Sequence, residues 1–216
     1  MPTVRSLSSS ISWSVLPLLA LAGATDALMI LHSKELLAVY MTGNSTKFAE
    51  FLLSGVWSKV GQLAAVLAAF IVFTTLAAWI GDRAGYLRSG LLLLIVGALL
   101  VAAAPLAVLV DQAYPLVAVM TIAAAMGTLN QVRADEPGVT FVTGTLVKLG
   151  RSLAAGKLPG ALDCLARWFG FLLGALLGAF ADVRLSAYTL SLLGVLAILG
   201  GIVVALAASR AHTVNA

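Results

Sequence analysis

Two related stretches of sequence decide how this chain is organised. The first is Thr25–Leu53, TDALMILHSKELLAVYMTGNSTKFAEFLL, and the second is Met126–Leu153, MGTLNQVRADEPGVTFVTGTLVKLGRSL. Thr42 of the first matches Thr143 of the second at an offset of 101 residues (143 − 42), and the glycine after each threonine keeps the same offset. The pattern indicates two related halves, each with a polar, glycine-marked segment between apolar runs.

The composition predicts an integral membrane protein. Of the 216 residues, 61% are hydrophobic and 10% are charged, and the mean hydropathy is +1.06. Soluble domains carry about a quarter charged residues, so these charges are too few to cover a soluble globule. The net charge of +4 is spread between the apolar runs, which argues against a nucleic-acid partner. The single cysteine, Cys164, excludes an intrachain disulfide. No motif indicates an enzyme, a cofactor or a metal site.

Six apolar runs predict six transmembrane helices, at residues 12–31, 60–80, 90–110, 115–131, 165–180 and 185–208. Because each half contributes an odd number of spans, the second half enters the membrane from the opposite side. We therefore expect an all-α protein with one membrane domain over 1–216. Its inverted three-helix repeats lie at 12–110 and 114–208, followed by a cytoplasmic tail at 209–216, of which 212–216 is expected to be disordered. A cleaved signal peptide is the alternative for the first run, although cleavage would remove part of the first repeat.

The basic residues predict the orientation in the membrane. Cytoplasmic loops collect lysine and arginine, so both termini are expected on the cytoplasmic side. The side that carries the termini would hold Arg5, Arg83, Arg88, Arg133, Lys148, Arg151, Lys157 and Arg210, whereas the other side would hold only Lys34, Lys47, Lys59 and Arg184.

The two Thr-Gly segments predict a pair of re-entrant or broken helices. Gly43 and Gly144 permit a turn that other residues resist, and the polar residues beside them (Asn44, Ser45, Thr143 and Thr145) are suited to capping a short helix. Two such hairpins from opposite faces would bring two helix N-termini together near the midplane of the bilayer, around a solute.

Lys47 and Lys148 suggest that the solute is anionic. Each is expected in the first turn of its short helix, where the helix dipole disfavours a cation by about 0.3–1 kcal/mol. A bound anion would offset that cost. The alternatives are that Glu50 pairs with Lys47, or that both lysines extend to lipid headgroups.

Asp26 is a charged residue inside the first apolar run, where a carboxylate is costly and often functional. It is a candidate proton or cation site, or else it caps a helix or pairs with Lys34 or another span. In the fourth run, Thr128, Asn130 and Gln131 either bind the solute or join helices by hydrogen bonds.

Other features favour structural roles. Asp163 and Arg167 have the spacing of a helix ion pair, and His32 is expected to be a solvated residue at the end of a span. The charges at 82–83 and 182–184 are expected in short loops that fix topology. Gly170, Gly174 and Gly178 form a stripe that allows close helix packing, against either another span or a second copy in a homo-oligomer.

TDALMIL with Asp26, MTGN at Met41–Asn44, LNQVR with Asn130, and VTGTL with Thr143–Thr145 together resemble the YoaK or DUF1275 family of bacterial inner-membrane proteins. The resemblance covers nearly the whole chain, although GTLN at 127–130 departs from the pattern. It implies a multi-pass protein of the bacterial inner membrane, often described as transporter-like.

Three functions follow as hypotheses. The favoured one is a secondary transporter of a small anionic solute, with Asp26 as the proton-coupling group. The solute would bind to Asp26, Thr42, Gly43, Asn44, Lys47, Asn130, Thr143, Gly144, Thr145 and Lys148. A passive channel with the same hairpins is the first alternative, and a membrane scaffold that assembles through the glycine stripe is the second.

Overall fold

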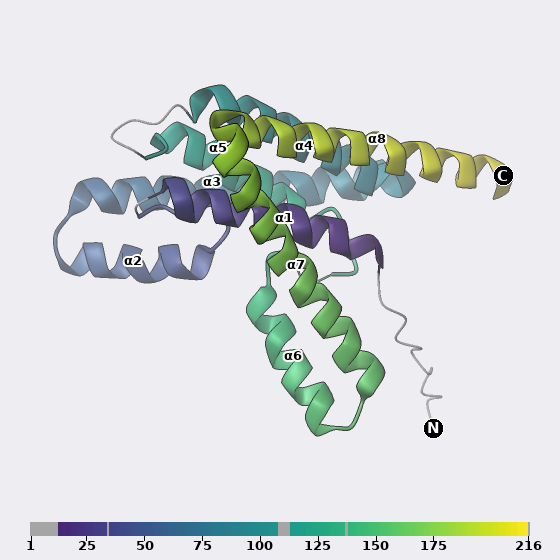
Figure 1. The fold of residues 1–216 in the computed structure, drawn as a ribbon. Coiled ribbons are helices and arrows are strands. Elements are labelled where there is room, and N and C mark those ends of the chain that lie inside the picture. The colour runs from purple at the N-terminus through teal and green to yellow at the C-terminus, as the bar shows by residue number, and fades with distance from the viewer. Residues whose placement is uncertain (1–12, 34, 108–112, 137, 216) are drawn as a thin grey trace.

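The computed structural model describes residues 13–33, 35–107, 113–136 and 138–215. The described chain forms helices and no strand (Figure 1). The helices are α1 (Leu16–His32), α2 (Met41–Leu53), α3 (Trp57–Ala84), α4 (Arg88–Leu106), α5 (Leu116–Leu129), α6 (Val142–Ala154), α7 (Leu158–Leu185) and α8 (Thr189–Asn215). Short 3₁₀ turns precede α1, α4 and α8 at Trp13–Val15, Gly85–Leu87 and Ser186–Tyr188. Lys34 and the turn at residues 111 and 112 lie outside the described residues.

The helices follow the 101-residue offset of the sequence. Helices α2 and α6 begin at residues 41 and 142, α3 and α7 at 57 and 158, and α4 and α8 at 88 and 189, a difference of 101 each time. The 3₁₀ turns at 85–87 and 186–188 keep the same difference. The two stretches that match in sequence therefore have the same order of helices around them, and the lengths agree for α2 and α6 (13 residues each) and for α3 and α7 (28 each).

A left-handed glycine closes each helical hairpin. Gly55, between α2 and α3, has φ +70°, and Gly156, between α6 and α7, has φ +65°. In each turn the residue after the glycine donates its N–H back to the last turn of the helix, from Val56 to Phe51 at 3.0 Å and from Lys157 to Ser152 at 2.9 Å. This Schellman arrangement satisfies carbonyl groups that would otherwise lack partners at a helix end.

Helix α1 packs closely and in parallel along α7, at the glycine stripe. Gly174 lies against Ala20 and Gly178 against Ala24, and from the other side Gly23 lies against the backbone of Phe171. Residue numbers rise together on both helices, so the helices run in the same direction. The glycines remove the side chains that would hold the two backbones apart, as in many membrane helix pairs.

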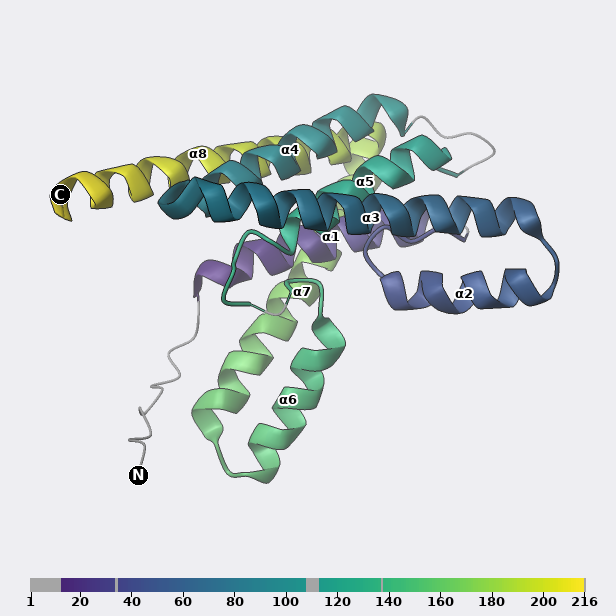
Figure 2. The same ribbon diagram turned by 180° about the vertical axis from the view of Figure 1, so that it is seen from behind.

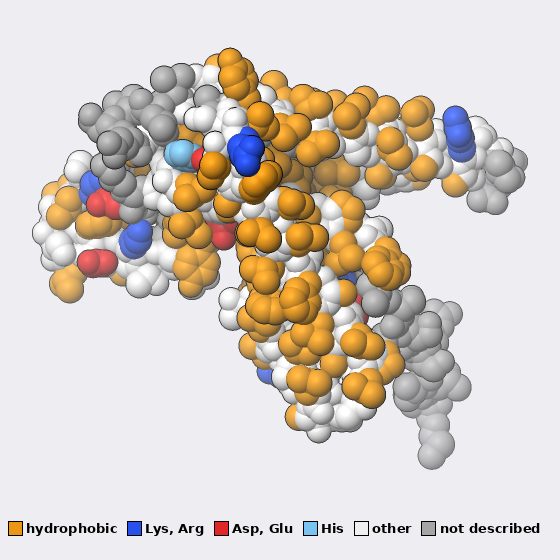
Figure 3. All heavy atoms as spheres, viewed as in Figure 1, with side chains coloured by type: hydrophobic (Ala, Val, Ile, Leu, Met, Phe, Trp, Pro, Cys, Tyr) orange, Lys and Arg blue, Asp and Glu red, His pale blue; other side chains and the backbone are white. Residues whose placement is uncertain are grey.

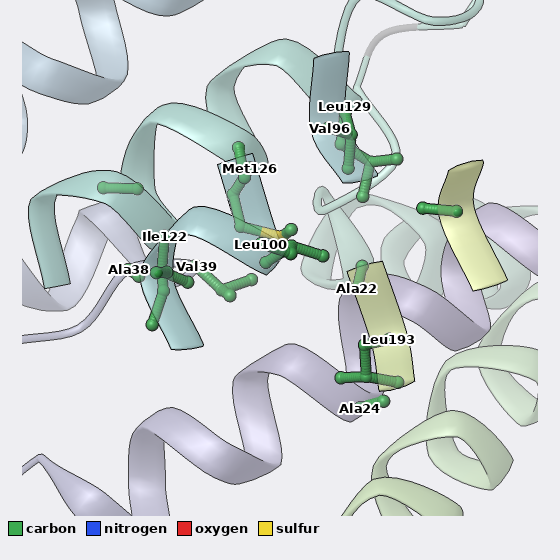
Figure 4. Close-up of a cluster of buried hydrophobic side chains, with 14 of the residues drawn as sticks. Ala22, Ala24, Ala38, Val39, Val96, Leu100, Ile122, Met126, Leu129 and Leu193 are labelled. Carbon is green, nitrogen blue, oxygen red and sulfur yellow. The ribbon is translucent and has the colours of Figure 1, made fainter. Parts of the chain in front are cut away.

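Helix α4 packs against α8 in the antiparallel direction. Gly90 lies against Ala205, and Gly97 against Gly194 and Ile198, so numbers rise on one helix as they fall on the other. The main core, part of which Figure 4 shows, is formed by buried apolar side chains including Val96, Leu100, Ile122, Met126, Leu129 and Leu193. Five of these six side chains come from α4 and α5.

Four segments are long and apolar enough to cross a membrane: Trp13–His32, Trp57–Leu106, Leu158–Leu185 and Thr189–Thr213. The second contains α3 and α4, which the turn at Gly85–Leu87 separates. Helix α5 has 14 residues and is therefore only about 21 Å long at about 1.5 Å per residue. Apolar side chains cover the outer faces of α7 and α8 (Figure 3).

Three expectations about the ends of the helices are wrong. Asp82 and Asp182 do not lie in short loops, because α3 continues to Ala84 and α7 to Leu185. The disorder expected from residue 212 is not found, because α8 continues to Asn215. In each case the helix extends beyond the apolar run, because charged residues are compatible with a helix once its end reaches water.

Candidate functional site

The first Thr-Gly segment is helical and internally satisfied. Helix α2 already begins at Met41, so Asn44 does not cap it, and Lys47 is in its second turn rather than its first. Asn44 is fully buried. Its side-chain oxygen accepts the Leu37 N–H at 3.0 Å, and its amide group donates to the Leu37 carbonyl at 2.5 Å. Lys47 Nζ donates to the Glu35 carbonyl at 3.0 Å, and no pair of Lys47 with Glu50 occurs among the described residues.

The glycines of both segments make room for an aromatic ring and do not form a turn. Gly43 and Gly144 are helical, and neither has a positive φ. A Cβ on Gly43 would lie 2.4 Å from the Tyr40 ring, and one on Gly144 would lie 2.0 Å from the Phe141 ring. Each ring therefore packs on the bare backbone of the first helical turn. Tyr40 and Phe141 hold the N-cap positions of α2 and α6, without side-chain capping bonds.

The second Thr-Gly segment borders a cavity of about 140 Å³. We call it the α6 cavity. Helix α6 contributes Gly144, Thr145 and Lys148 to its wall. The remaining lining residues come from the 3₁₀ turn before α1, from α1 itself, from the connection between α5 and α6, and from α7. They are Val15, Leu19, Glu136, Gly138, Val139, Phe141, Cys164 and Arg167. Three of the residues predicted to bind a solute thus lie together on one side of a real cavity.

An ionic cluster forms part of this wall. Arg167 donates two hydrogen bonds to Glu136, at 2.7 and 2.9 Å, and a third to Asp163 at 2.9 Å. The predicted pair of Asp163 and Arg167 is therefore confirmed, and Glu136 joins it from 31 residues away. The side chains of Arg167 and Glu136 are only 16% and 15% exposed. Bidentate bonds of this kind hold both groups in one orientation.

Polar side chains also fix the chain that connects α5 to α6. Asn130 donates to Thr140 Oγ1 at 3.0 Å and accepts the Thr140 N–H at 3.0 Å. Arg133 donates to Asp135 and, at 2.8 Å, to Ser14 Oγ in the 3₁₀ turn before α1. The hydrogen bond from Arg133 lowers the pKa of the Asp135 carboxyl. Asn130 was expected either to bind the solute or to join helices by hydrogen bonds, and in this structure its side chain bonds to protein groups.

Asp26 lies within α1 and is half-buried. One of its carboxylate oxygens, Oδ1, is buried without a hydrogen-bond partner among the described residues. Thr128, also expected in the site, is buried and donates to the Ala124 carbonyl of its own helix at 2.9 Å. Among the described residues, Glu35, Asp182 and Thr189 also have a buried side-chain oxygen without a hydrogen-bond partner.

The structure separates the remaining predicted site residues. Thr42 and Thr143 are both exposed. Helix α2 packs beside α3, and α6 packs beside α7. Helices α2 and α6 lie in different parts of the molecule in both views (Figures 1 and 2). The two Thr-Gly segments therefore do not meet around one solute in this structure.

A second polar cluster, which the sequence did not indicate, joins the ends of α1 and α7. His32 Nε2 lies 2.7 Å from Asp182 Oδ2, and their side chains are 18% and 10% exposed. The His32 ring stacks on Tyr114, with centroids 4.9 Å apart. Burial and the charge of Asp182 raise the pKa of Tyr114. The expectation that His32 is solvated is wrong, because its side chain is mostly buried against Asp182, which lies 150 positions later in the sequence.

A larger cavity, of about 530 Å³, lies between α1, α7 and α8. Its lining is entirely apolar or glycine and includes Leu18, Leu21, Gly174, Leu177 and Leu196. Such a wall offers no hydrogen bond or charge to a polar solute, so the α6 cavity is the better candidate for a functional site.

The helices, their apolar outer faces and the charged α6 cavity define the protein as a helical protein of membrane-spanning character. Residues 15–206 match the family described as DUF1275, a protein family of unknown function. The chain belongs to this family, as its Thr-Gly motifs indicated. No curated protein and no solved structure matches the chain.

Proposed function

We propose that this protein is a secondary transporter of a small anionic solute in the bacterial inner membrane. The observation that carries the proposal is the α6 cavity, where Gly144, Thr145 and Lys148 lie beside the buried Arg167–Glu136 pair. Charged and polar groups in a protein of this composition are costly unless they serve a polar pathway or a site. The DUF1275 description assigns no function, so the site itself is the basis of the proposal.

Six spans in two inverted halves are the architecture that we propose. In that arrangement α1 and α7 cross the membrane in the same direction as each other, whereas α4 and α8 cross it in opposite directions. The parallel packing of α1 with α7 and the antiparallel packing of α4 with α8 agree with it. The short α5 counts as a span because ten of its 14 residues are buried. A helix that is surrounded by other helices does not have to be as long as the hydrocarbon core is thick, because protein rather than lipid lies around its ends.

The polar contacts between helix ends agree with the same topology. His32, Tyr114 and Asp182 meet at one end, where α1 and α7 finish and α5 starts. At the other end, Arg88 at the start of α4 donates to the Gln131 carbonyl at the end of α5, at 2.9 Å. Together with the predominance of lysine and arginine on the second of these sides, this favours cytoplasmic termini.

Asp26 is the proposed proton-coupling group. A carboxylate with an unpaired buried oxygen in an apolar helix is stabilised when it takes up a proton. Protonation and solute binding in one protein allow a proton gradient to drive uptake. The glycine stripe that also suggested a scaffold is covered by α1 within the chain, which favours the transporter over assembly through that stripe.

Uptake into proteoliposomes tests the proposal. Radiolabelled pyruvate, lactate and methanesulfonate would be supplied with and without an inward proton gradient, with protein-free vesicles as the baseline. We expect saturable uptake of at least one anion that the gradient accelerates, and loss of that acceleration in Asp26→Asn. Asp82→Asn is the matched control, because the Asp82 side chain is 74% exposed. Non-saturating flux that is indifferent to pH would indicate a passive channel instead, and no uptake of any of these anions would refute the transporter.

A further inference from the structure

The two Thr-Gly segments differ at the positions that decide whether a cavity exists. At the 101-residue offset, Glu35 matches Glu136, Gly43 matches Gly144 and Lys47 matches Lys148. Three other positions differ between the two halves. Asn44, Leu63 and Val66 of the first half correspond to Thr145, Cys164 and Arg167 of the second.

In the first half, these side chains fill the space. Asn44, Leu63 and Val66 are all fully buried. Asn44 uses its amide group on the backbone of Leu37. Lys47 is held by the Glu35 carbonyl. The amide group of Asn44 and the ammonium group of Lys47 therefore already have protein partners.

In the second half, the equivalent positions form the wall of the α6 cavity. Thr145 is smaller than asparagine, and its hydroxyl makes a single long bond, 3.4 Å, to the Phe141 carbonyl. Cys164 and Arg167 line the cavity in place of Leu63 and Val66. Lys148 lines it too, and within the described residues no acidic side chain pairs with its ammonium group.

Charge and size define the class of solute. The charged residues that line the cavity are Lys148, Arg167 and Glu136. Glu136 takes both outer nitrogens of Arg167, and Asp163 takes its Nε. Lys148 is therefore the cation in the wall that has no acidic partner among the described residues. One water needs about 10–15 Å³ of such space, so a cavity of about 140 Å³ holds on the order of ten water-sized groups.

We infer that the second half alone holds the solute, a compact monoanion of about ten non-hydrogen atoms or fewer, with the first half as its closed structural counterpart. Lys148 pairs with the carboxylate or sulfonate, and the Thr145 hydroxyl donates to it. This inference rests on the proposed function and narrows it, because it assigns one site per chain and limits the solute in charge and size.

Binding to the full-length purified protein in detergent tests the inference. Pyruvate and methanesulfonate are the compact monoanions, and naphthalene-2-sulfonate is the oversized one; calorimetric titration or thermal stabilisation gives the Kd. We expect Lys148→Gln to weaken the binding of the compact anions at least tenfold and Lys47→Gln to change it less than twofold. Thr145→Asn places the residue of the first half into the second, and we expect it to abolish binding while the protein stays folded.

The outcomes separate the site from the function. Equal losses of affinity in Lys47→Gln and Lys148→Gln would overturn the inference that the second half alone holds the solute. Binding that survives Thr145→Asn, tight binding of naphthalene-2-sulfonate, or no binding of any compact anion would also overturn the inferred site. If proton-driven uptake persists in Lys148→Gln, the transporter stands and the inferred site falls. If binding follows the expected pattern but no uptake occurs, the site stands and the transporter falls.

Discussion

The close crossing of α1 and α7 gives the sharpest test of the fold. In Gly174→Ala, the added Cβ would lie 2.1 Å from the Ala20 carbonyl oxygen and 2.4 Å from the Ala20 Cα. Ordinary contact begins at 3.4 Å, so the backbones must separate by about 1.3 Å (3.4 − 2.1). The obstacle is backbone, which cannot rotate away as a side chain can.

The expected cost follows from this geometry. Overpacking a well-packed interface destabilises a protein by about 1–3 kcal/mol, and a shift of more than 1 Å along two parallel helices places Gly174→Ala at the upper end. The matched control is Gly61→Ala in α3, where no atom lies within 4 Å of the added Cβ. Alanine is favoured over glycine within a helix by about 0.5–1 kcal/mol, so the control is expected to be neutral or more stable.

The measurement is denaturant unfolding of each variant in the same mild detergent, followed by helical circular dichroism. We expect the free energies of unfolding of the two variants to differ by about 2–3 kcal/mol, the upper end of the overpacking cost, because the helix preference of alanine applies to both variants and cancels in the difference. If Gly174→Ala is as stable as Gly61→Ala, then α1 and α7 do not pack backbone to backbone, and the parallel pairing that supports the inverted halves is wrong.

Two further predictions use the same unfolding measurement. His32→Ala leaves the buried Asp182 without its partner, and we expect a loss of about 3–5 kcal/mol. Asp82→Asn removes a carboxylate that is 74% exposed from Arg88, which keeps its bond to the Gln131 carbonyl, so this change is expected to cost no more than about 1 kcal/mol. Similar costs would show that Asp182 is not buried. Ser186 adopts φ +47° and its counterpart Gly85 φ +55°, so Ser186→Gly is expected to stabilise by about 1 kcal/mol and Gly85→Ala to destabilise by a similar or larger amount. A destabilised Ser186→Gly would contradict the conformation of that turn.

The sequence alone predicted the membrane class, the family and the 101-residue correspondence of the halves. These properties depend on runs of apolar residues and on the spacing of motifs along the chain. The helices of the two halves keep the same offset. The Asp163–Arg167 pair was predictable for the same reason, because its residues are one helical turn apart. Lys148, Thr145 and Gly144 were also named as site residues, and they line one cavity.

The local predictions failed where the backbone conformation depended on a neighbour. Gly43 and Gly144 suggested turns, and the asparagine and threonines beside them suggested caps, but both helices begin earlier, at Met41 and Val142. The glycines lie under the rings of Tyr40 and Phe141. A glycine that permits a turn and a glycine that makes room for a ring look the same in a sequence.

By itself, the sequence determined that the chain forms apolar helices in two matching sets, because hydropathy and helix length are properties of consecutive residues. Only the tertiary structure decided which helices pack together. That packing in turn decided which polar groups have hydrogen-bond partners. Glu136 reaches Arg167 across 31 residues, and His32 reaches Asp182 across 150. One Thr-Gly segment is closed by Asn44, Leu63 and Val66 while the other borders a cavity. The physical reason is that the cost of a buried charge or an unfilled volume depends on every atom around it, and most of those atoms belong to residues that are distant in the chain.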